Sequence, residues 1–362
     1  MTEITEPAPQ KKNFDFVDTI RCLSMLGIVF EHTEEFGAAN YESFYTSMLQ
    51  VSVMQFFKFA TIAFFLIAGF LINHKFKEYT ALQYLKNRFK STIGPWMLWI
   101  NIFMIIDISN LLFMTYIKHH GEGSMPSPFI SYLLNGYYNI IFKTSFWFIL
   151  NFLICIAILL LFKKYIYKIG LGIALFLVSL FYSINLYHGW LATSHTTALF
   201  GFVFFLWLGA YINRHSEVVF SFIRKISYVW LIGITVLFFL MADLEIIHLK
   251  AIGNEDSYNT LRITNILYSL SFFLILLKVG SIPFVNRFFL PRKTTFGIYL
   301  THQIIITHLL KEIFYPLHWQ MDSMTVFGAL GYSILRYIIT YSISFLIVRL
   351  ILLTKFRWSI GG

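Results

Sequence analysis

Charged residues are scarce in this chain. Asp, Glu, Lys and Arg make up 13% of its 362 residues, whereas soluble domains carry about 25%. This scarcity excludes an ordinary soluble globular domain. Cysteine is rare as well, and Cys22 and Cys155 both fall inside apolar runs. Two such cysteines argue against a disulfide framework or a cysteine metal site, and we expect each to be a small buried hydrophobic residue.

Hydrophobic residues are abundant. They account for 57% of the chain, which has 41 Phe and a mean hydropathy of +0.68. Apolar runs of roughly 17 to 25 residues recur with short polar connections, which is typical of membrane-spanning helices. The sequence therefore predicts an all-α integral membrane protein, a bundle of about ten transmembrane helices. The expected spans are 16–36, 49–73, 93–117, 145–162, 169–187, 198–213, 228–249, 262–280, 296–316 and 325–354.

Basic residues are unevenly distributed between these spans. Most Lys and Arg occur in alternate connections and near both ends of the chain, whereas the other connections hold most of the acidic residues. By the positive-inside rule both termini are expected in the cytosol, in a cell inner (plasma) membrane. The net charge of +10 then reflects topology, and no nucleic-acid partner is expected. Residues 1–14 should form a short cytosolic tail and 15–362 one transmembrane domain without an attached soluble domain.

The first expected span carries ionisable residues that are costly inside a membrane. Arg21 and His32 are eleven positions apart, so on a helix they share one face, about 16 Å apart along the axis. Asp18 shares this face, Glu35 can reach the imidazole from the next turn, and Glu31 lies about 100° away. A guanidinium suits phosphate and an imidazole can accept a proton. The pattern is equally consistent with a structural role, in which the Arg21 side chain extends to the inner headgroups and His32 lies at the outer interface.

The arrangement Arg-x10-His, preceded by Asp18, resembles the signature of the membrane acyltransferase-3 family. Further stretches resemble motifs of that family in the same order: FFLIAGFLI (64–72), NRFKSTIGPWMLW (87–99), FWFILNFL (146–153), FFLWLGAYI (204–212) and FGIYLTHQIII (296–306). Three positions depart from the usual pattern, with Ala68 for Ser, Ser91 for the second basic residue and Phe296 for Tyr. Together the motifs cover nearly the entire chain.

This resemblance implies an acyl-CoA donor on the cytosolic side and a cell-surface glycan, polysaccharide or glycolipid as acceptor. No cofactor is expected beyond acyl-CoA as co-substrate. In this hypothesis Arg21, with Arg88 and Lys90, holds the CoA phosphates. His32 is the general base for the acceptor hydroxyl, with Glu35 as its orienting partner. The transferred group is expected to be acetyl.

Other residues have two readings. Trp147 begins a span and is either an interfacial anchor or a stacking surface for the acceptor. His302 lies mid-span, where hydrogen bonding to a neighbouring helix is as consistent as catalysis, and Asp18 is a candidate near the site. Asp107 and Asp243 are expected to pair helices. The outer-loop histidines lack ligand partners at metal spacing, so no metal is expected.

Rival functions remain open at this point. An exporter or transporter of polysaccharide or glycolipid would use the charged groups to bind cargo at the midplane, but broken helices and repeat symmetry, its usual signs, are weak here. A membrane acyltransferase of the MBOAT type would also use an intramembrane histidine. An acyl-enzyme on Cys22 ranks low, because Cys22 lies about 100° from the Arg21–His32 face.

Overall fold

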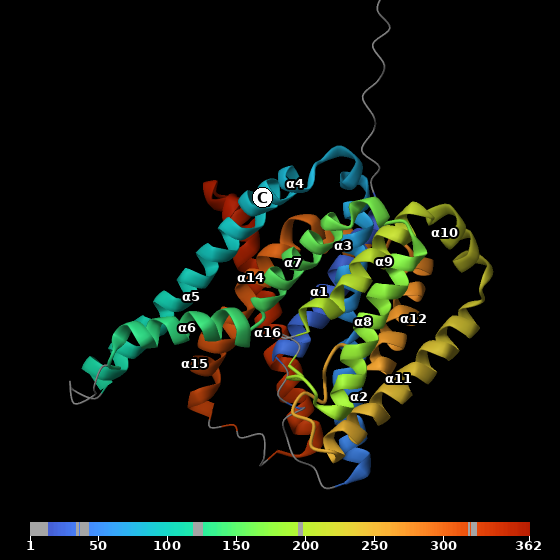
Figure 1. The fold of residues 1–362 in the computed structure, drawn as a ribbon. Helices are drawn as coiled ribbons and strands as arrows, with labels where there is room; N and C mark the ends of the chain where they lie inside the picture. Colours follow the sequence, from blue (N-terminus) through green and yellow to red (C-terminus); the bar gives the residue numbers. More distant parts are fainter. Residues whose placement is uncertain are drawn as a thin grey trace, which may run out of the picture.

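The computed structural model describes the residues in seven ranges: 14–33, 36, 43–118, 126–194, 198–317, 319 and 324–362. Of residues 74–78, 81 and 90 it describes the backbone. The described residues form helices and connecting turns without any strand (Figure 1). The helices are α1 (Asp15–Thr33), α2 (Phe44–Phe57), α3 (Phe59–Glu78), α4 (Ala81–Arg88), α5 (Gly94–Leu112), α6 (Phe129–Lys143), α7 (Trp147–Leu161), α8 (Ile169–His188), α9 (Val203–Arg214), α10 (Ser216–Lys225), α11 (Tyr228–Ala251), α12 (Ile263–Val279), α13 (Pro283–Phe289), α14 (Pro291–Ile304), α15 (Leu310–Phe314) and α16 (Val326–Leu352).

The all-helical membrane fold expected from the sequence is confirmed, and each expected span coincides with helix. By length and composition, the described residues contain 5 helical stretches able to cross a membrane. Two bent pairs, α6 with α7 (67°) and α12 with α13 (98°), raise this to 7. Helix α1 is not among them because Asp18, Arg21 and Glu31 interrupt its apolar sequence. The count of ten therefore stays a prediction.

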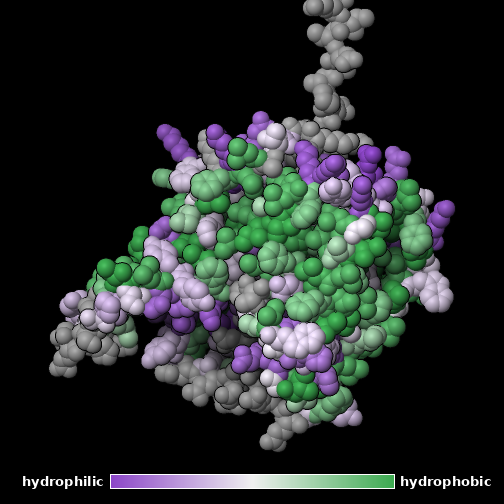
Figure 2. Space-filling model, in the orientation of Figure 1, coloured by the Kyte–Doolittle hydropathy of each residue, from purple (hydrophilic) through white to green (hydrophobic). Residues whose placement is uncertain are grey.

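The surface is banded as expected for a protein in a bilayer. Figure 2 shows a broad hydrophobic belt across this face, with hydrophilic side chains gathered along its upper edge. The first described residues and the C-terminus lie at this same end of the molecule (Figure 1). The fold thus puts the first described residues and the C-terminus on one side, and the distribution of basic residues predicts that this side is the cytosol.

Helix α3 and helix α9 cross at the centre of the bundle, where two glycines remove the side chains that would keep the backbones apart. A Cβ atom at Gly69 would lie 1.9 Å from the carbonyl oxygen of Leu206, and one at Gly209 would lie 2.0 Å from that of Leu66. Small residues allow membrane helices to gain van der Waals contact at short range. Helix α1 packs on α3 and also on α14 and α16, so this crossing supports the helix that carries Arg21 and His32.

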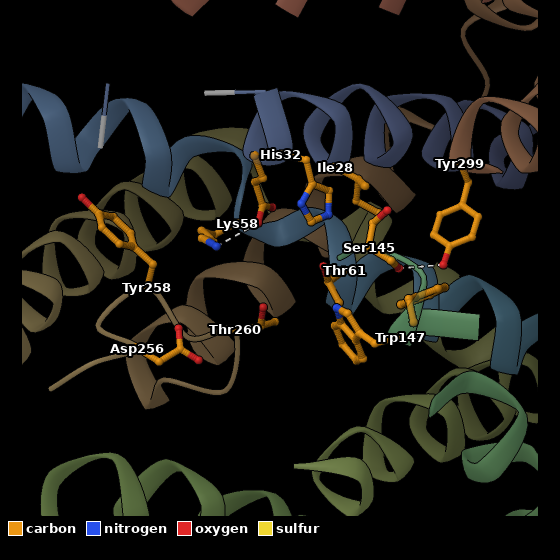
Figure 3. A pocket seen from close by; sticks show the side chains of 12 residues that line it. Ile28, His32, Lys58, Thr61, Ser145, Trp147, Asp256, Tyr258, Thr260 and Tyr299 are labelled. Carbon is orange, nitrogen blue, oxygen red and sulfur yellow. Dashed lines mark hydrogen bonds and ion pairs between the residues drawn. The ribbon is translucent and has the colours of Figure 1, made fainter. Parts of the chain in front are cut away.

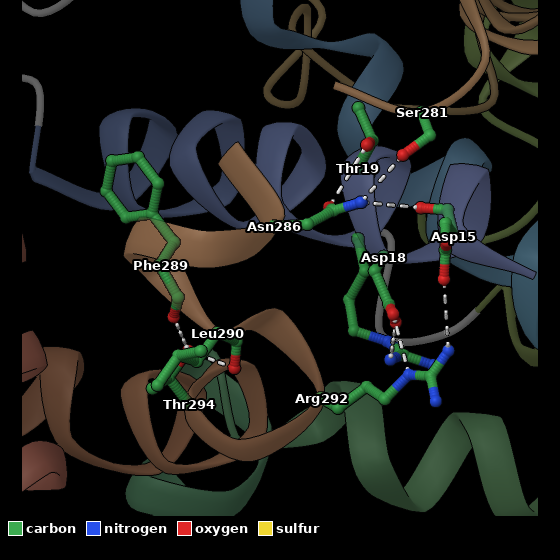
Figure 4. Close-up of polar contacts among 10 residues, drawn as sticks. Asp15, Asp18, Thr19, Ser281, Asn286, Phe289, Leu290, Arg292 and Thr294 are labelled. Atoms are coloured by element: carbon green, nitrogen blue, oxygen red, sulfur yellow. Dashed lines mark hydrogen bonds and ion pairs between the residues drawn. The ribbon is translucent and has the colours of Figure 1, made fainter. Parts of the chain in front are cut away.

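The short helix α13 and the bend that follows it fix α14 against α1 (Figure 4). They lie at the end of the molecule that the distribution of basic residues predicts to be cytosolic. Asn286 of α13 accepts a hydrogen bond from Thr19 (3.1 Å) and donates one to the backbone carbonyl of Asp15 (3.0 Å). Leu290 then adopts a left-handed conformation with φ of 48°, and Pro291 begins α14 with a ring suited to the first helical turn. This bend carries the start of α14 to the side of α1.

The close crossing yields a stability prediction. Gly209→Ala should lower the free energy of unfolding by about 1–3 kcal/mol, because the added methyl group overlaps a rigid backbone carbonyl. Thermal unfolding of the purified protein in detergent, followed by circular dichroism, measures the effect. Gly233→Ala is the matched control, since a Cβ atom at this α11 position meets nothing within 4 Å. Equal melting temperatures for both variants would contradict the proposed role of the crossing.

Candidate active site

Two cavities lie along one face of α1. The first, which we call the arginine cavity, has a volume of about 310 Å³ and is lined by the guanidinium-bearing residues Arg21, Arg88 and Arg292. The second, the histidine cavity, has a volume of about 190 Å³ and is lined by His32 with residues of four other chain segments (Figure 3). The helical spacing of Arg21 and His32 places them in different cavities on the same helix.

The arginine cavity is organised by one carboxylate. Asp18 accepts hydrogen bonds from Arg21 (2.9 Å) and from Arg292 (2.6 Å), one on each oxygen (Figure 4). Arg292 also lies 4.0 Å from the carboxylate of Asp15. Because Asp18 orients both guanidiniums from one side, their remaining N–H donors are available for an anion. Asp18 therefore belongs to the arginine end of α1, away from His32.

Arg88 reaches the same cavity from the end of α4. Its Nε donates to the hydroxyl of Tyr84 (3.0 Å), and its guanidinium lies 5.3 Å from the centre of that ring. The wide π-helical turn that follows, Phe89–Ile93, brings Ser91 and Thr92 to the cavity wall. Such turns reorient side chains at functional sites. Lys90 belongs to this turn, and its side chain lies outside what the structure describes.

The histidine cavity gathers residues that are distant in sequence. His32 lines it together with Thr61 of α3 and Trp147 at the start of α7. Trp147 is 9% exposed and lies against Phe148 and Phe202, with ring centres 6.1 and 5.8 Å away. A side chain so enclosed is not an anchor at the lipid interface. Its position beside His32 matches the alternative reading, a surface on which an acceptor could stack.

The connection between α11 and α12 forms another wall of the histidine cavity. It contributes Asp256, Tyr258 and Thr260, which the sequence analysis did not single out. The completely buried Arg262 holds this connection by donating to the carbonyl of Asn259 (3.1 Å) and, through its terminal nitrogens, to the carbonyl of Ala242 and the side chain of Gln55. In the sequence, these three residues belong to the polar run 254–262, which is typical of an ordinary loop and gave no indication of a site.

Three side chains separate the two cavities. Ile28 of α1, Phe148 of α7 and Tyr299 of α14 line both. The Tyr299 hydroxyl donates to the carbonyl of Ser145 (2.7 Å), which fixes this ring across the boundary (Figure 3). The two cavities are therefore adjacent, and a single layer of side chains forms the wall between them.

The imidazole ring of His302 lies next to that of His32, with 5.5 Å between the two ring centres. It is fully buried, and its Nδ1 lies 2.8 Å from the carbonyl of Tyr299 and 3.1 Å from that of Ile298. Because carbonyl oxygens accept hydrogen bonds, this geometry assigns the proton to Nδ1 and leaves the lone pair on Nε2. The Nε2 atom makes no hydrogen bond within the described part of the chain. The partner of His302 is thus its own helix rather than a neighbouring one.

Several other sequence predictions have outcomes. Glu35 lies outside the described residues. Asp243 of α11 accepts a hydrogen bond from Ser52 of α2 (2.6 Å), which confirms that it pairs helices. Asp107 of α5 lies 3.5 Å from His308 in the turn after α14, but Nε2 of His308 makes no hydrogen bond within the described residues, so helix pairing by Asp107 stays a prediction. Cys22 and Cys155 are buried with free thiols. Among the described residues no group of three or more His, Cys, Asp and Glu could hold a metal.

The site combines three guanidinium groups around one cavity with two neighbouring imidazole rings. The second cavity also contains the aromatic ring of Trp147 and the carboxylates of Glu31 and Asp256. In comparisons with known proteins, a family model described as an acyltransferase domain, that of the acyltransferase-3 family, matches residues 14–349. No curated protein and no solved structure gives a significant match. The matched range covers nearly the whole chain, including every residue that lines the histidine cavity and every residue that lines the arginine cavity except Gly361. The chain therefore belongs to the acyltransferase-3 family of membrane acyltransferases.

Proposed function

We propose that this protein is an O-acyltransferase that moves an acyl group, acetyl in the simplest case, from cytosolic acyl-CoA to a hydroxyl of a cell-surface glycan, polysaccharide or glycolipid. The observation that carries the proposal is the pair of cavities on one face of α1. One has the chemistry to hold a phosphorylated donor, and the other has a base and space for an alcohol.

The donor would bind with its phosphates at the arginine cavity. Arg21, Arg88 and Arg292 converge there, and guanidinium groups bind phosphate through paired N–H donors. The pantetheine arm would extend along α1 toward His32, about 16 Å farther along the axis. To reach it, the arm has to displace the shared wall, and Phe148 and Tyr299 are side chains that can turn aside.

The chemical step would occur in the histidine cavity. His32 takes the proton of the acceptor hydroxyl while the hydroxyl oxygen attacks the thioester carbonyl. The tetrahedral intermediate then collapses, the carbon–sulfur bond breaks, and CoA leaves as a thiol with a proton returned from His32. The products are an ester and free CoA, and the base is regenerated.

His302 would act through His32. The two ring centres are 5.5 Å apart, and Nε2 of His302 makes no hydrogen bond within the described part of the chain, so it could accept a hydrogen bond from one nitrogen of the His32 ring. The other His32 nitrogen would then take the substrate proton. His302 is thus proposed as a positioning residue, a role that the sequence analysis had given to Glu35.

The first prediction concerns the base. His32→Ala should lower acetyl transfer from labelled acetyl-CoA by about 10²–10⁴-fold, because general-base assistance is lost. The assay follows label into a glycolipid extract with purified protein in lipid. His188→Ala, at an exposed position at the end of α8, should keep full activity. Full activity of the His32 variant would refute the mechanism, and absence of acyl-CoA consumption by the wild type would favour the exporter.

A second prediction concerns the donor site. Arg21→Ala and Arg292→Ala should each raise the apparent KM for acetyl-CoA about tenfold or more, because a charge-assisted hydrogen bond to phosphate is lost. The KM for the acceptor should not change. Arg224→Ala, an exposed residue of α10 on a different part of the surface, is the control.

S-acetylpantetheine sharpens this measurement, because it has the thioester and the arm but no phosphate. Wild type and both arginine variants should use it equally well. If the variants lose activity with this donor to the same extent as with acetyl-CoA, the arginines do not act on the phosphates.

A third prediction tests His302. His302→Phe should lower kcat by about tenfold or more with little change in either KM, since the base loses its orienting acceptor. His302→Gln, which keeps an acceptor oxygen, should recover part of the loss. Equal defects in both variants, or a defect confined to KM, would assign His302 a purely structural role.

A further inference from the structure

A buried ion pair lies beside His32 in the histidine cavity. The ammonium of Lys58 is 2.9 Å from Oε2 of Glu31, and the two side chains are 11% and 10% exposed. Both residues line the cavity, and Figure 3 shows the contact next to the His32 ring. Lys58 occupies the junction of α2 and α3, within the stretch Phe44–Asn73 that is long and apolar enough to cross a membrane.

Helix packing does not account for this pair. The rings of Phe30 and Phe57 stack with centres 4.1 Å apart at the same contact, and a Cβ atom at Gly27 would lie 3.0 Å from that of Ala60. The helices are therefore already in close apolar contact. Since desolvation offsets most of the attraction in a buried ion pair, apolar side chains would hold the helices equally well. Ionisable groups kept inside a membrane protein point to a functional site.

The hydrogen bonding of the pair is incomplete. Oε1 of Glu31 is buried and has no hydrogen-bond partner within the described part of the chain. An ionised carboxylate oxygen without a donor is unfavourable in a protein interior. The Lys58 ammonium has three N–H donors, of which Glu31 takes one. The pair can therefore accept one hydrogen bond and donate others to a bound molecule.

We propose that Glu31 and Lys58 form a subsite for a second hydroxyl of the acceptor, so that the preferred acceptor is a vicinal diol such as a sugar ring presents. The inference rests on the proposed role of His32 as the base. Glu31 and His32 are neighbours in sequence, so their side chains leave α1 about 100° apart and face adjacent parts of one cavity. As His32 takes the proton from one hydroxyl, Glu31 accepts a hydrogen bond from the next hydroxyl and Lys58 donates to its oxygen.

The opposite wall of the cavity suits the same ligand. Asp256 and Thr260 present polar groups, and Trp147 presents an apolar face. A sugar ring has hydroxyls at its edge and C–H groups on its faces, which match these two kinds of surface. The cavity thus offers polar contacts on two sides and an aromatic contact on a third.

Two alcohols that differ by one hydroxyl test the proposal. Purified protein in lipid receives labelled acetyl-CoA with either trans-1,2-cyclohexanediol or cyclohexanol. The wild type should show a kcat/KM about 10- to 100-fold higher for the diol, as expected when a site is built to hydrogen-bond a hydroxyl. In the double variant Glu31→Leu with Lys58→Met this advantage should fall to about onefold, because neither new side chain can hydrogen-bond the second hydroxyl.

The double variant is chosen because it removes both charges together. A single substitution would leave a buried charge without its partner and destabilise the fold, whereas replacing both is close to neutral. Asp243→Asn is the matched control. Asp243 also has a buried carboxylate oxygen without a hydrogen bond in the described part of the chain, but it lies on α11 and does not line the cavity. This variant should keep the diol advantage.

Thermal protection gives a readout that needs no chemistry. The diol should raise the melting temperature of the wild type more than cyclohexanol does, because it binds the folded state more tightly. This difference should vanish in the double variant. If the wild type consumes no acyl-CoA and yet shows the diol-specific shift, the proposed acyltransferase function fails and the diol subsite stands. A folded double variant that keeps the diol advantage, or a wild type that lacks it in both readouts, overturns the proposal.

Discussion

The carboxylate of Asp18 holds two guanidinium groups at once, and the arrangement of the arginine cavity depends on this interaction. Arg21 comes from α1 and Arg292 from α14, so a single buried anion joins these two helices, which are distant in sequence. Without it, two cations would face each other at the edge of a low-dielectric region. With it, the two guanidiniums and the carboxylate together keep one net positive charge. Asp18 is thus both a helix-to-helix contact and the group that orients two of the arginines lining the cavity.

The same requirement, that charge be balanced inside an apolar bundle, explains the distribution of the other polar groups. Arg262 is buried among carbonyl and amide oxygens and thereby holds the connection that bears Asp256 and Thr260. Farther along α1, beside His32, Glu31 forms an ion pair with Lys58. The connection held by Arg262 and the Glu31–Lys58 pair both border the histidine cavity. In a bilayer such clusters cannot be placed on the outside without cost, so they lie inside the bundle.

Much of this organisation could be predicted from sequence because it is local. The apolar runs gave the helices, and the eleven-residue spacing placed Arg21 and His32 on one face of α1. The contribution of Arg292 could not be predicted, because it depends on the bend at Leu290 that returns α14 to α1. Glu31 was set aside because it lies 100° from the Arg21–His32 face. The cavity nevertheless spans that angle, since Lys58 and the connection between α11 and α12 approach from the side.

The wall formed by Ile28, Phe148 and Tyr299 also determines how water is distributed inside the bundle. A passage that carries a pantetheine arm is wide enough for a file of water molecules, and such a file conducts protons. Because these three side chains stand between the cavities, water in one cavity is not continuous with water in the other along this face of α1. Inside a membrane protein, a wall of this kind limits the leakage of protons from one water-filled space to the next.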